Sequence, residues 1–240
     1  MPHEPSKPGT ADGLGLFSGL SLLGRVASFL GRGSSMTSSI RNVIFDMGGV
    51  LMTFDSKRFA TIFTDTEEDA ELLDRALFNR NEWALLDAGV ISHETMRRIA
   101  EAALPERLLP NLHECIAHWP EHSEPIAPTN SFAAQLKKRG FGLYLLSNAS
   151  TRIDEQLGHC PAYPLMDGRV VSAEERLMKP DPAIYQLLCE RYGLDPATCI
   201  FVDDNLNNCH GAEVAGMQSL HFITDDAEAS VAQLERILDL

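Results

Sequence analysis

Basic residues are scarce in this sequence. Twenty lysines and arginines stand against 34 aspartates and glutamates, which gives a formal net charge of −14 at pH 7. Nucleic acids and anionic membranes bind proteins through a basic face, because a positive surface is needed to compensate the phosphate charge. The charge balance therefore argues against nucleic acid and membrane partners.

A CxxC pair is also absent. The five cysteines are an odd number at wide spacing, at positions 115, 160, 189, 199 and 209. A disulfide framework or a zinc site of paired cysteines would need a different pattern. We expect reduced, mostly buried thiols in a cytoplasmic protein, which functions as a monomer or a homodimer.

No apolar run is long enough to span a membrane. The most apolar N-terminal stretch, residues 14–30, is interrupted by Arg25 and several glycines, and it lacks the basic flank and cleavage site of a signal peptide. Residues 1–13 are rich in proline, glycine and serine or threonine, which is typical of disorder. We expect residues 1–40 to be a disordered or weakly helical arm without a catalytic role, and Met36 is an alternative start.

The stretch that organises the chain is residues 43–51. Val43 to Phe45 form a short apolar run that ends in Asp46 and is followed by two glycines. Such a run suits a strand buried on both faces of a parallel sheet, and the glycines allow a ligand to approach the main chain. Taken alone, the stretch is equally compatible with an aspartate that opens a glycine turn.

The block that follows, residues 54–124, has the spacing of apolar residues expected of helices. The clearest segments are Arg58–Phe63, Glu67–Phe78 and His93–Ala103. Within the block, Trp83, Leu85 and Leu86 are predicted to lie in a helical core rather than to line an entrance. The proline-rich stretch Trp119–Asn130 is predicted to be a connecting strap.

From Ser131 onward, helices and strands alternate. The expected helices are Ser131–Arg139, Pro182–Tyr192, Asn208–Ala215 and a terminal one, and the expected strands are Phe141–Leu146, Arg169–Val171, Cys199–Val202 and Ser219–Ile223. This alternation predicts an α/β fold with a doubly wound, mainly parallel sheet. We predict a catalytic core of residues 41–53 and 125–240, with residues 54–124 inserted as a helical cap.

Polar residues follow three of the predicted strands. Asp46 ends the first, Ser147 and Asn148 end the second, and Asp203 and Asp204 end another. A lysine, Lys179, stands before a helix in the sequence KPDP. Each of these residues alone could be a helix cap, an acidic loop or a surface lysine, but the carboxyl ends of parallel strands are where α/β sheets hold ligands.

In this order, the residues resemble the four motifs of the haloacid dehalogenase-like hydrolase superfamily. Residues 45–51 (FDMGGVL) resemble the first motif, residues 145–150 (LLSNAS) the second, Lys179 the third and residues 201–208 (FVDDNLNN) the fourth. The similarity covers about residues 42–224. The inserted helical block resembles the small cap of subfamily IA. The residues of the first and fourth motifs resemble those of a bacterial branch that includes glucose-1-phosphatase-like proteins.

The resemblance implies a phosphatase that uses covalent catalysis. Asp46 would attack phosphorus and form an aspartyl-phosphate, which splits one difficult step into two. Ser147, with the adjacent main-chain amide and Asn148, would bind the phosphate, and Lys179 would neutralise developing charge. The substrate would be a small phosphorylated metabolite, such as a sugar phosphate.

The resemblance also implies a magnesium ion. Its ligands would be the Asp46 carboxylate, the Gly48 carbonyl and Asp204, with Asp203 or Asn208 in support. Carboxylate, carbonyl and water oxygens are the ligands that Mg²⁺ prefers, and a divalent cation would offset the repulsion between the acids and a phosphate dianion.

Gly48 departs from the pattern of the superfamily's phosphatases, which usually carry an acid–base aspartate at this position. Either another group supplies the proton, with Asp55 a candidate, or the enzyme prefers esters with good leaving groups. The dehalogenase branch also lacks this aspartate. Two alternatives therefore stay open: a metal-independent 2-haloacid dehalogenase, and a catalytically weak protein that binds a phosphometabolite.

Overall fold

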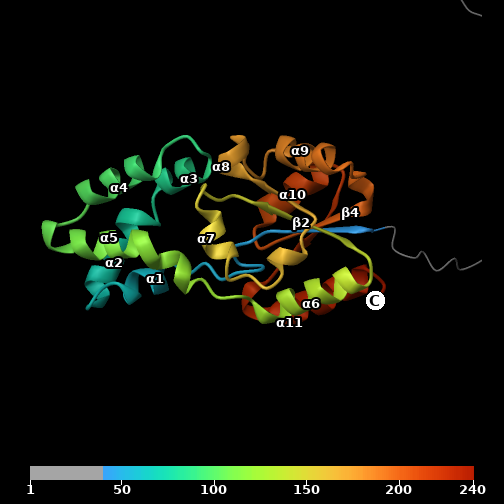
Figure 1. Ribbon diagram of the computed structural model, residues 1–240, viewed down its shortest axis with the longest axis horizontal. Helices are drawn as coiled ribbons and strands as arrows, with labels where there is room; N and C mark the ends of the chain where they lie inside the picture. Colours follow the sequence, from blue (N-terminus) through green and yellow to red (C-terminus); the bar gives the residue numbers. More distant parts are fainter. Residues whose placement is uncertain (1–39) are drawn as a thin grey trace, which may run out of the picture. The chain divides into compact units, whose positions relative to one another are not determined.

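The computed structural model describes residues 40–240 and contains a five-stranded parallel sheet (Figure 1). The expected N-terminal arm and the alternative start at Met36 lie outside the described residues. The sheet order is β3-β2-β1-β4-β5, with every neighbouring pair parallel. The strands are β1 Asn42–Phe45, β2 Gly142–Ser147, β3 Gly168–Val171, β4 Cys199–Asp203 and β5 Gln218–His221. The predicted doubly wound α/β fold is confirmed.

Helices cover both faces of the sheet. Val43 and Phe45 of β1 point into one apolar cluster and Ile44 into the other, as expected for a strand buried on two sides. The first cluster lies under helices α6 (Ala127–Lys138) and α11 (Ala227–Ile237), which run side by side in Figure 1. The second lies under α9 (Pro182–Tyr192) and α10 (Leu206–Val214). The central strand therefore positions its carboxyl end with little freedom to move.

The predicted strap over residues 119–130 holds for residues 119–126, which connect the cap to the sheet, and is wrong for residues 127–130. Residues Trp119–His122 form a 3₁₀ turn, and α6 already begins at Ala127 rather than at the predicted Ser131. Pro128 stands in the first turn of α6, where the missing N–H of proline is tolerated because no intrahelical partner would accept it. Pro128, one of the prolines that suggested a linker, therefore marks the start of a helix.

The inserted block contains five helices. They are α1 Ser56–Ile62, α2 Glu67–Leu77, α3 Asn81–Asp87, α4 His93–Ala102 and α5 Leu109–His118. Side chains of Asp55, Thr66 and Ser92 cap α1, α2 and α4 by accepting main-chain N–H bonds. The block has an apolar cluster of its own, which includes Leu86 as predicted, whereas Leu85 is exposed. We refer to it as the cap.

Two chain segments join the cap to the sheet and bond to each other. The main-chain N–H of Thr53 donates to the Glu124 carbonyl at 2.8 Å, and the N–H of Glu124 donates to Thr53 Oγ1 at 2.9 Å. The Ser123 hydroxyl donates to the Thr53 carbonyl at 2.7 Å. The cap is therefore attached through a paired, hydrogen-bonded neck. Among residues 40–240, no helix is long and apolar enough to cross a membrane.

The shorter elements complete the described chain. They are the helices α7 Ile153–Leu157 and α8 Ser172–Glu175 and the 3₁₀ turns Glu106–Leu108, Tyr163–Leu165, Pro196–Thr198 and Thr224–Asp226. All five cysteines are buried and free, as predicted.

Candidate active site

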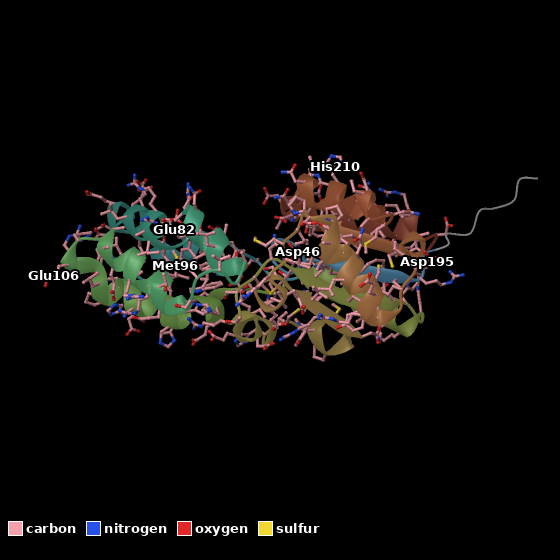
Figure 2. All side chains as sticks on the ribbon, turned by 90° about the horizontal axis from the view of Figure 1, so that it is seen from above. Asp46, Glu82, Met96, Glu106, Asp195 and His210 are labelled. Carbon is pink, nitrogen blue, oxygen red and sulfur yellow. The ribbon has the colours of Figure 1, made fainter. Side chains whose placement is uncertain are left out.

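Asp46 lies directly after the central strand, where the cap meets the sheet (Figure 2). Its side chain is mostly buried, at 8 % exposure. The carboxylate accepts a hydrogen bond from the Met47 N–H at 2.7 Å and contacts the Lys179 ammonium at 2.8 Å. One oxygen of Asp46 is therefore held in place by two donors at the carboxyl edge of the sheet.

Lys179 bridges two strand ends. Its side chain is buried, and its ammonium lies 2.7 Å from Asp203 as well as 2.8 Å from Asp46. Burial lowers the pKa of Lys179, but the two adjacent carboxylates outweigh it and the net shift is upward. Lys179 is therefore a permanent cation in contact with Asp46.

Asn148 holds the lysine through its main chain. The side-chain oxygen of Asn148 accepts the Lys179 N–H at 2.9 Å, and its amide group donates to the Lys179 carbonyl at 2.9 Å. Both polar ends of this side chain thus contact one residue. The sequence prediction that Asn148 binds substrate stays a prediction, and the geometry adds that Asn148 positions Lys179.

Asp203 is surrounded by donors. It is fully buried and accepts hydrogen bonds from the Asn205 N–H at 2.8 Å and the Asn208 side chain at 3.0 Å, besides the contact with Lys179. A buried carboxylate is stable as an ion only when it is bonded in this way. Asn208 therefore holds Asp203, and Lys179 links Asp203 to Asp46.

Asp204 lies against the glycine turn after β1. Gly49 has a φ of +74°, and a Cβ there would stand 2.4 Å from Asp204 Oδ2. Glycine is needed at this position both for its backbone conformation and for the close approach of the carboxylate. Gly48, by contrast, has an ordinary φ and room for a Cβ, whose nearest neighbour would be 3.6 Å away.

The three acids form a cluster that could hold a cation. Oxygen atoms of Asp46, Asp203 and Asp204 lie within 4.8 Å of one another, and no other such group occurs among residues 40–240. Burial raises the pKa of Asp46 to about 7; the Lys179 charge opposes this rise, and Asp203 and Asp204 add to it. Burial and the Asp203 charge also raise the pKa of Asp204. The single positive charge of Lys179 therefore does not balance the charge of the three carboxylates. A set of donors made only of oxygen atoms fits Mg²⁺.

The site opens into a cleft of about 800 Å³ between the sheet edge and the cap. Ser147, at the end of β2, lies on the sheet side together with Asp46 and Asp204. Phe54, Trp83 and Trp119 line the cap side. The Phe54 ring is 42 % exposed and lies 5.7 Å from the Trp119 ring and 6.1 Å from the Trp83 ring. The expectation that Trp83 is only a core residue is therefore incomplete, since it also lines the cleft.

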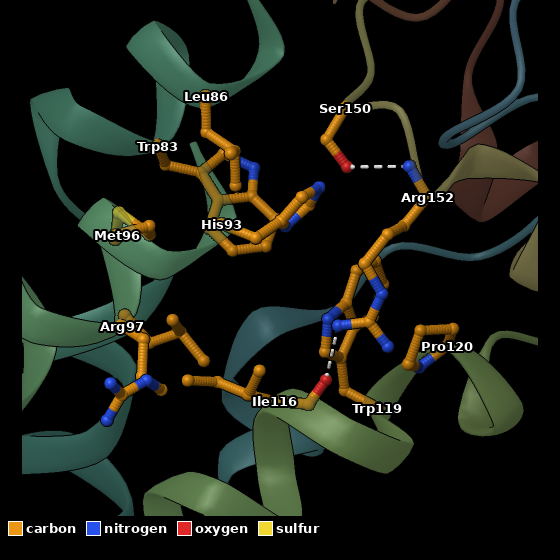
Figure 3. Close-up of a pocket in the computed structure, with 11 residues that line it drawn as sticks. Trp83, Leu86, His93, Met96, Arg97, Ile116, Trp119, Pro120, Ser150 and Arg152 are labelled. Carbon is orange, nitrogen blue, oxygen red and sulfur yellow. Dashed lines mark hydrogen bonds between the residues drawn. The ribbon is translucent and has the colours of Figure 1, made fainter. Parts of the chain in front are cut away.

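Arg152 connects the loop after β2 with the cap (Figure 3). Its main-chain N–H donates to the Ser150 hydroxyl at 3.3 Å, and its guanidinium donates to the Ile116 carbonyl of α5 at 2.8 Å. In Figure 3, Trp83 and Trp119 lie on the cap side of this contact. The arginine binds the carbonyl end of a cap helix, where a cation is favourable.

Among the cleft residues that were not found from the sequence are Phe54, Asp87 and Arg152. Phe54 stands one residue outside the neck, and its exposure shows only in the folded chain. Asp87 ends α3 and is followed by Gly89, a turn signal without a functional pattern. Arg152 stands two residues beyond the motif-like stretch. A search for motifs could not have found any of the three, because folding rather than spacing brings them to the cleft.

Comparisons with known proteins point to one family of hydrolases. Residues 40–216 match the family model of haloacid dehalogenase-like hydrolases. The sesquiterpene phosphatase astK of Aspergillus oryzae is 28 % identical over 209 residues, which are 85 % of this chain and 99 % of that protein. The (S)-2-haloacid dehalogenase 4A of Burkholderia cepacia is 24 % identical over 77 % of this chain and 84 % of its own.

A solved structure supports the fold. A family enzyme from Bacteroides thetaiotaomicron, an Asp-to-Ala variant in complex with magnesium and inorganic phosphate, superposes with a TM-score of 0.58. It is 20 % identical, and the match covers 75 % of this chain and 92 % of that one. At this identity the likeness concerns the fold alone.

Proposed function

Since the chain belongs to the haloacid dehalogenase-like hydrolases, we propose that it is a Mg²⁺-dependent phosphomonoester hydrolase for a small phosphorylated metabolite. The observation that carries the proposal is the contact of one carboxylate, Asp46, with a buried lysine inside a cluster of three acids. We place the enzyme in the cytoplasm, as a monomer or a homodimer, in keeping with its five free thiols.

Asp46 is the nucleophile of the proposed reaction. The Lys179 contact and the Met47 N–H bond fix Asp46 Oδ1, which leaves the carboxylate oriented before substrate binds. Attack on phosphorus forms an aspartyl-phosphate and releases the alcohol; water then hydrolyses the intermediate and restores Asp46. Lys179 and Ser147 stabilise the phosphoryl oxygens as charge develops on them.

A magnesium ion would be held by Asp46, Asp204 and the Gly48 carbonyl, with Asp203 and Asn208 as support. When bound, it would neutralise charge on the acids and on the phosphate. The close approach of Asp204 to the Gly49 main chain supports this donor set, since it brings a carboxylate beside the glycine turn.

The aromatic wall of the cleft bears on the substrate. Phe54, Trp83 and Trp119 offer ring faces and edges to whatever is esterified to the phosphate. Such a wall favours a leaving group with an apolar face, for instance a sugar ring or an isoprenoid chain. The similarity to a sesquiterpene phosphatase along most of the chain is the reason to include prenyl phosphates.

A 2-haloacid dehalogenase is the second candidate function. Gly48 and the similarity to the Burkholderia cepacia dehalogenase favour it. The cluster of three acids speaks against it, because a reaction without a metal has no counter-charge for Asp204. A phosphometabolite-binding protein of low activity would use the same pocket and would bind esters without turnover.

The decisive experiment measures phosphate release from a panel of sugar phosphates and prenyl phosphates, with Mg²⁺ and with a chelator. We expect turnover that depends on Mg²⁺. Full activity in chelator would contradict the metal requirement, and chloride release from 2-chloropropionate would favour the dehalogenase. Tight binding of the esters with no turnover would favour the binding protein.

A further inference from the structure

The proposed reaction needs a proton donor that Gly48 does not provide. The alcohol leaves as an anion unless an acid protonates its oxygen, and the water that attacks the aspartyl-phosphate must lose a proton to a base. Besides Asp46 and Asp204, the cleft is lined by the carboxyls of Asp55, Asp87 and Asp225, of which Asp225 is exposed to solvent. The candidates differ in what holds them.

Asp55 is engaged in a structural role. Its carboxylate caps α1 by accepting the Arg58 N–H at 3.0 Å. This bond engages the carboxylate in holding the first turn of the helix, which makes Asp55 a poor candidate for proton transfer to a substrate.

Asp87 is fixed at the seam between cap and core. Its main-chain carbonyl accepts a hydrogen bond from the Ser172 hydroxyl, which in turn accepts the Ala149 N–H at 2.9 Å. Two residues further on, Gly89 lies so close to the core that a Cβ would stand 2.5 Å from the Ala173 carbonyl oxygen. The end of α3 is therefore tied to the loop that follows Ser147.

The Asp87 carboxyl points to the same loop. It lines the cleft together with Ser150, three residues after Ser147. Burial raises the pKa of Asp87 to about 7; the Ser150 main-chain N–H opposes this rise, and the charge of Asp46 adds to it. The charged and titratable groups around it in the cleft are Asp46, Asp55, Lys57, Arg152, Asp204 and Asp225. Asp87 can thus hold a proton near neutral pH beside the phosphate-binding loop.

We propose that Asp87, supplied by the cap, is the general acid and base of this enzyme. The inference rests on the proposed function. As the Asp46 oxygen bonds to phosphorus and the ester P–O bond breaks, the Asp87 proton passes to the leaving oxygen, and a neutral alcohol departs. Water then attacks the aspartyl-phosphate, gives one proton to the Asp87 carboxylate and its hydroxide to phosphorus, and frees Asp46 and inorganic phosphate.

The test compares leaving groups in Asp87→Asn and Asp55→Asn. The probes are phosphate esters that range from alkyl alcohols to nitrophenol. For Asp87→Asn we expect kcat/KM to fall by about 10²–10⁴ with alkyl esters and to change little with the nitrophenyl ester, whose anion needs no proton. Asp55→Asn keeps a good helix cap, and its dependence on the leaving group should match that of the wild type.

A rescue variant guards against a merely structural effect. Gly48 has space for a side chain, so Gly48→Asp combined with Asp87→Asn should restore turnover of alkyl esters. In the wild type, kcat/KM for alkyl esters should fall as the pH rises through about 7 relative to kcat/KM for the nitrophenyl ester, which serves as an internal reference. This measurement needs no variant and stands if Asp87→Asn fails to fold.

The outcomes separate the two claims. If the wild type is active and Asp87→Asn shows the same dependence of kcat/KM on the leaving group, the role of Asp87 is overturned. A dependence that becomes steeper only in Asp55→Asn would overturn it as well. If the variant cannot be obtained, an equal pH response of alkyl and nitrophenyl esters would overturn it. A wild type inactive on every ester would overturn the proposed function, and the inference with it.

Discussion

The two walls of the cleft are built in different ways. On the sheet side, Asp46, Lys179 and Asp203 are buried and bonded to one another, and Asn148 and Asn208 hold them from behind. On the cap side, the half-exposed side chain of Phe54 and two tryptophans form an apolar surface beside two acids, Asp55 and Asp87. We infer that the sheet provides the fixed charges of the proposed reaction, whereas the cap provides contacts for the leaving group and, with Asp87, the proposed proton donor.

The largest expected effect lies on the sheet side. Asp46→Asn is nearly isosteric, but an amide is a very poor nucleophile, so turnover should be abolished while the fold remains intact. Phosphate release and thermal unfolding of the purified variant check this. More than a few per cent of residual activity would contradict covalent catalysis by Asp46.

Lys179→Ala tests the neighbouring cation. Losing one preorganised charge stabiliser typically reduces kcat by about 10²–10³, and removing the counter-ion also leaves Asp46 and Asp203 facing each other. We expect both a fall of kcat on that scale and a lower melting temperature. Lys179→Arg is the control that keeps the charge but not the geometry, and an unchanged kcat in Lys179→Ala would exclude the lysine from the reaction.

A smaller effect is expected on the cap side from Phe54→Ala. Loss of the exposed ring should raise KM about tenfold for esters with an apolar leaving group, while kcat changes little, because the ring lies on the leaving-group side of the cleft. Because Phe54→Leu keeps apolar surface, its KM for these esters should lie between the KM of the wild type and that of Phe54→Ala. Equal KM changes for apolar esters and for a small polar ester such as glycerol phosphate would argue that Phe54 only supports the fold.

The smallest expected effect is on stability. The pKa of Asp87 is raised to about 7 in the folded protein from an ordinary value of 3.8, so the folded state keeps a proton that the unfolded state has released. Asp87 therefore costs no stability below about pH 4, an increasing amount as the pH rises toward 7, and a constant amount above that. Asp87→Asn removes this cost and should raise the melting temperature by at least about 2 °C at pH 8 and by almost nothing at pH 4.

A matched control for this stability effect is Asp55→Asn. Asp55 is an exposed helix cap, and asparagine caps a helix about as well as aspartate, so its replacement should leave the melting temperature close to that of the wild type. A melting temperature of Asp87→Asn that runs parallel to the wild type from pH 4 to pH 8 would show that the Asp87 carboxyl is not held protonated.

Much of the core could be predicted from local signals. Short apolar runs that end in Asp46, Ser147 and Asp203 predict strands of a parallel sheet, and topology brings the carboxyl ends of such strands to one edge. Asp181 before Pro182 marks the start of α9 as predicted, since a capping side chain and a first-turn proline act within the same few residues. The start of α6 was predicted at Ser131 instead of Ala127, because prolines occur in linkers as well as in the first turn of helices.

The sequence by itself determined the fold class, the family and the residues at the sheet edge, because each depends on patterns a few residues long repeated in a set order. Tertiary structure alone decided the roles of the others. Asn148 turned toward the main chain of Lys179, 31 residues away, and Asp87 reached the loop after Ser147 through contacts that span more than 60 residues. Such contacts leave no local pattern, since which side chains meet across the cleft depends on how the cap packs against the sheet.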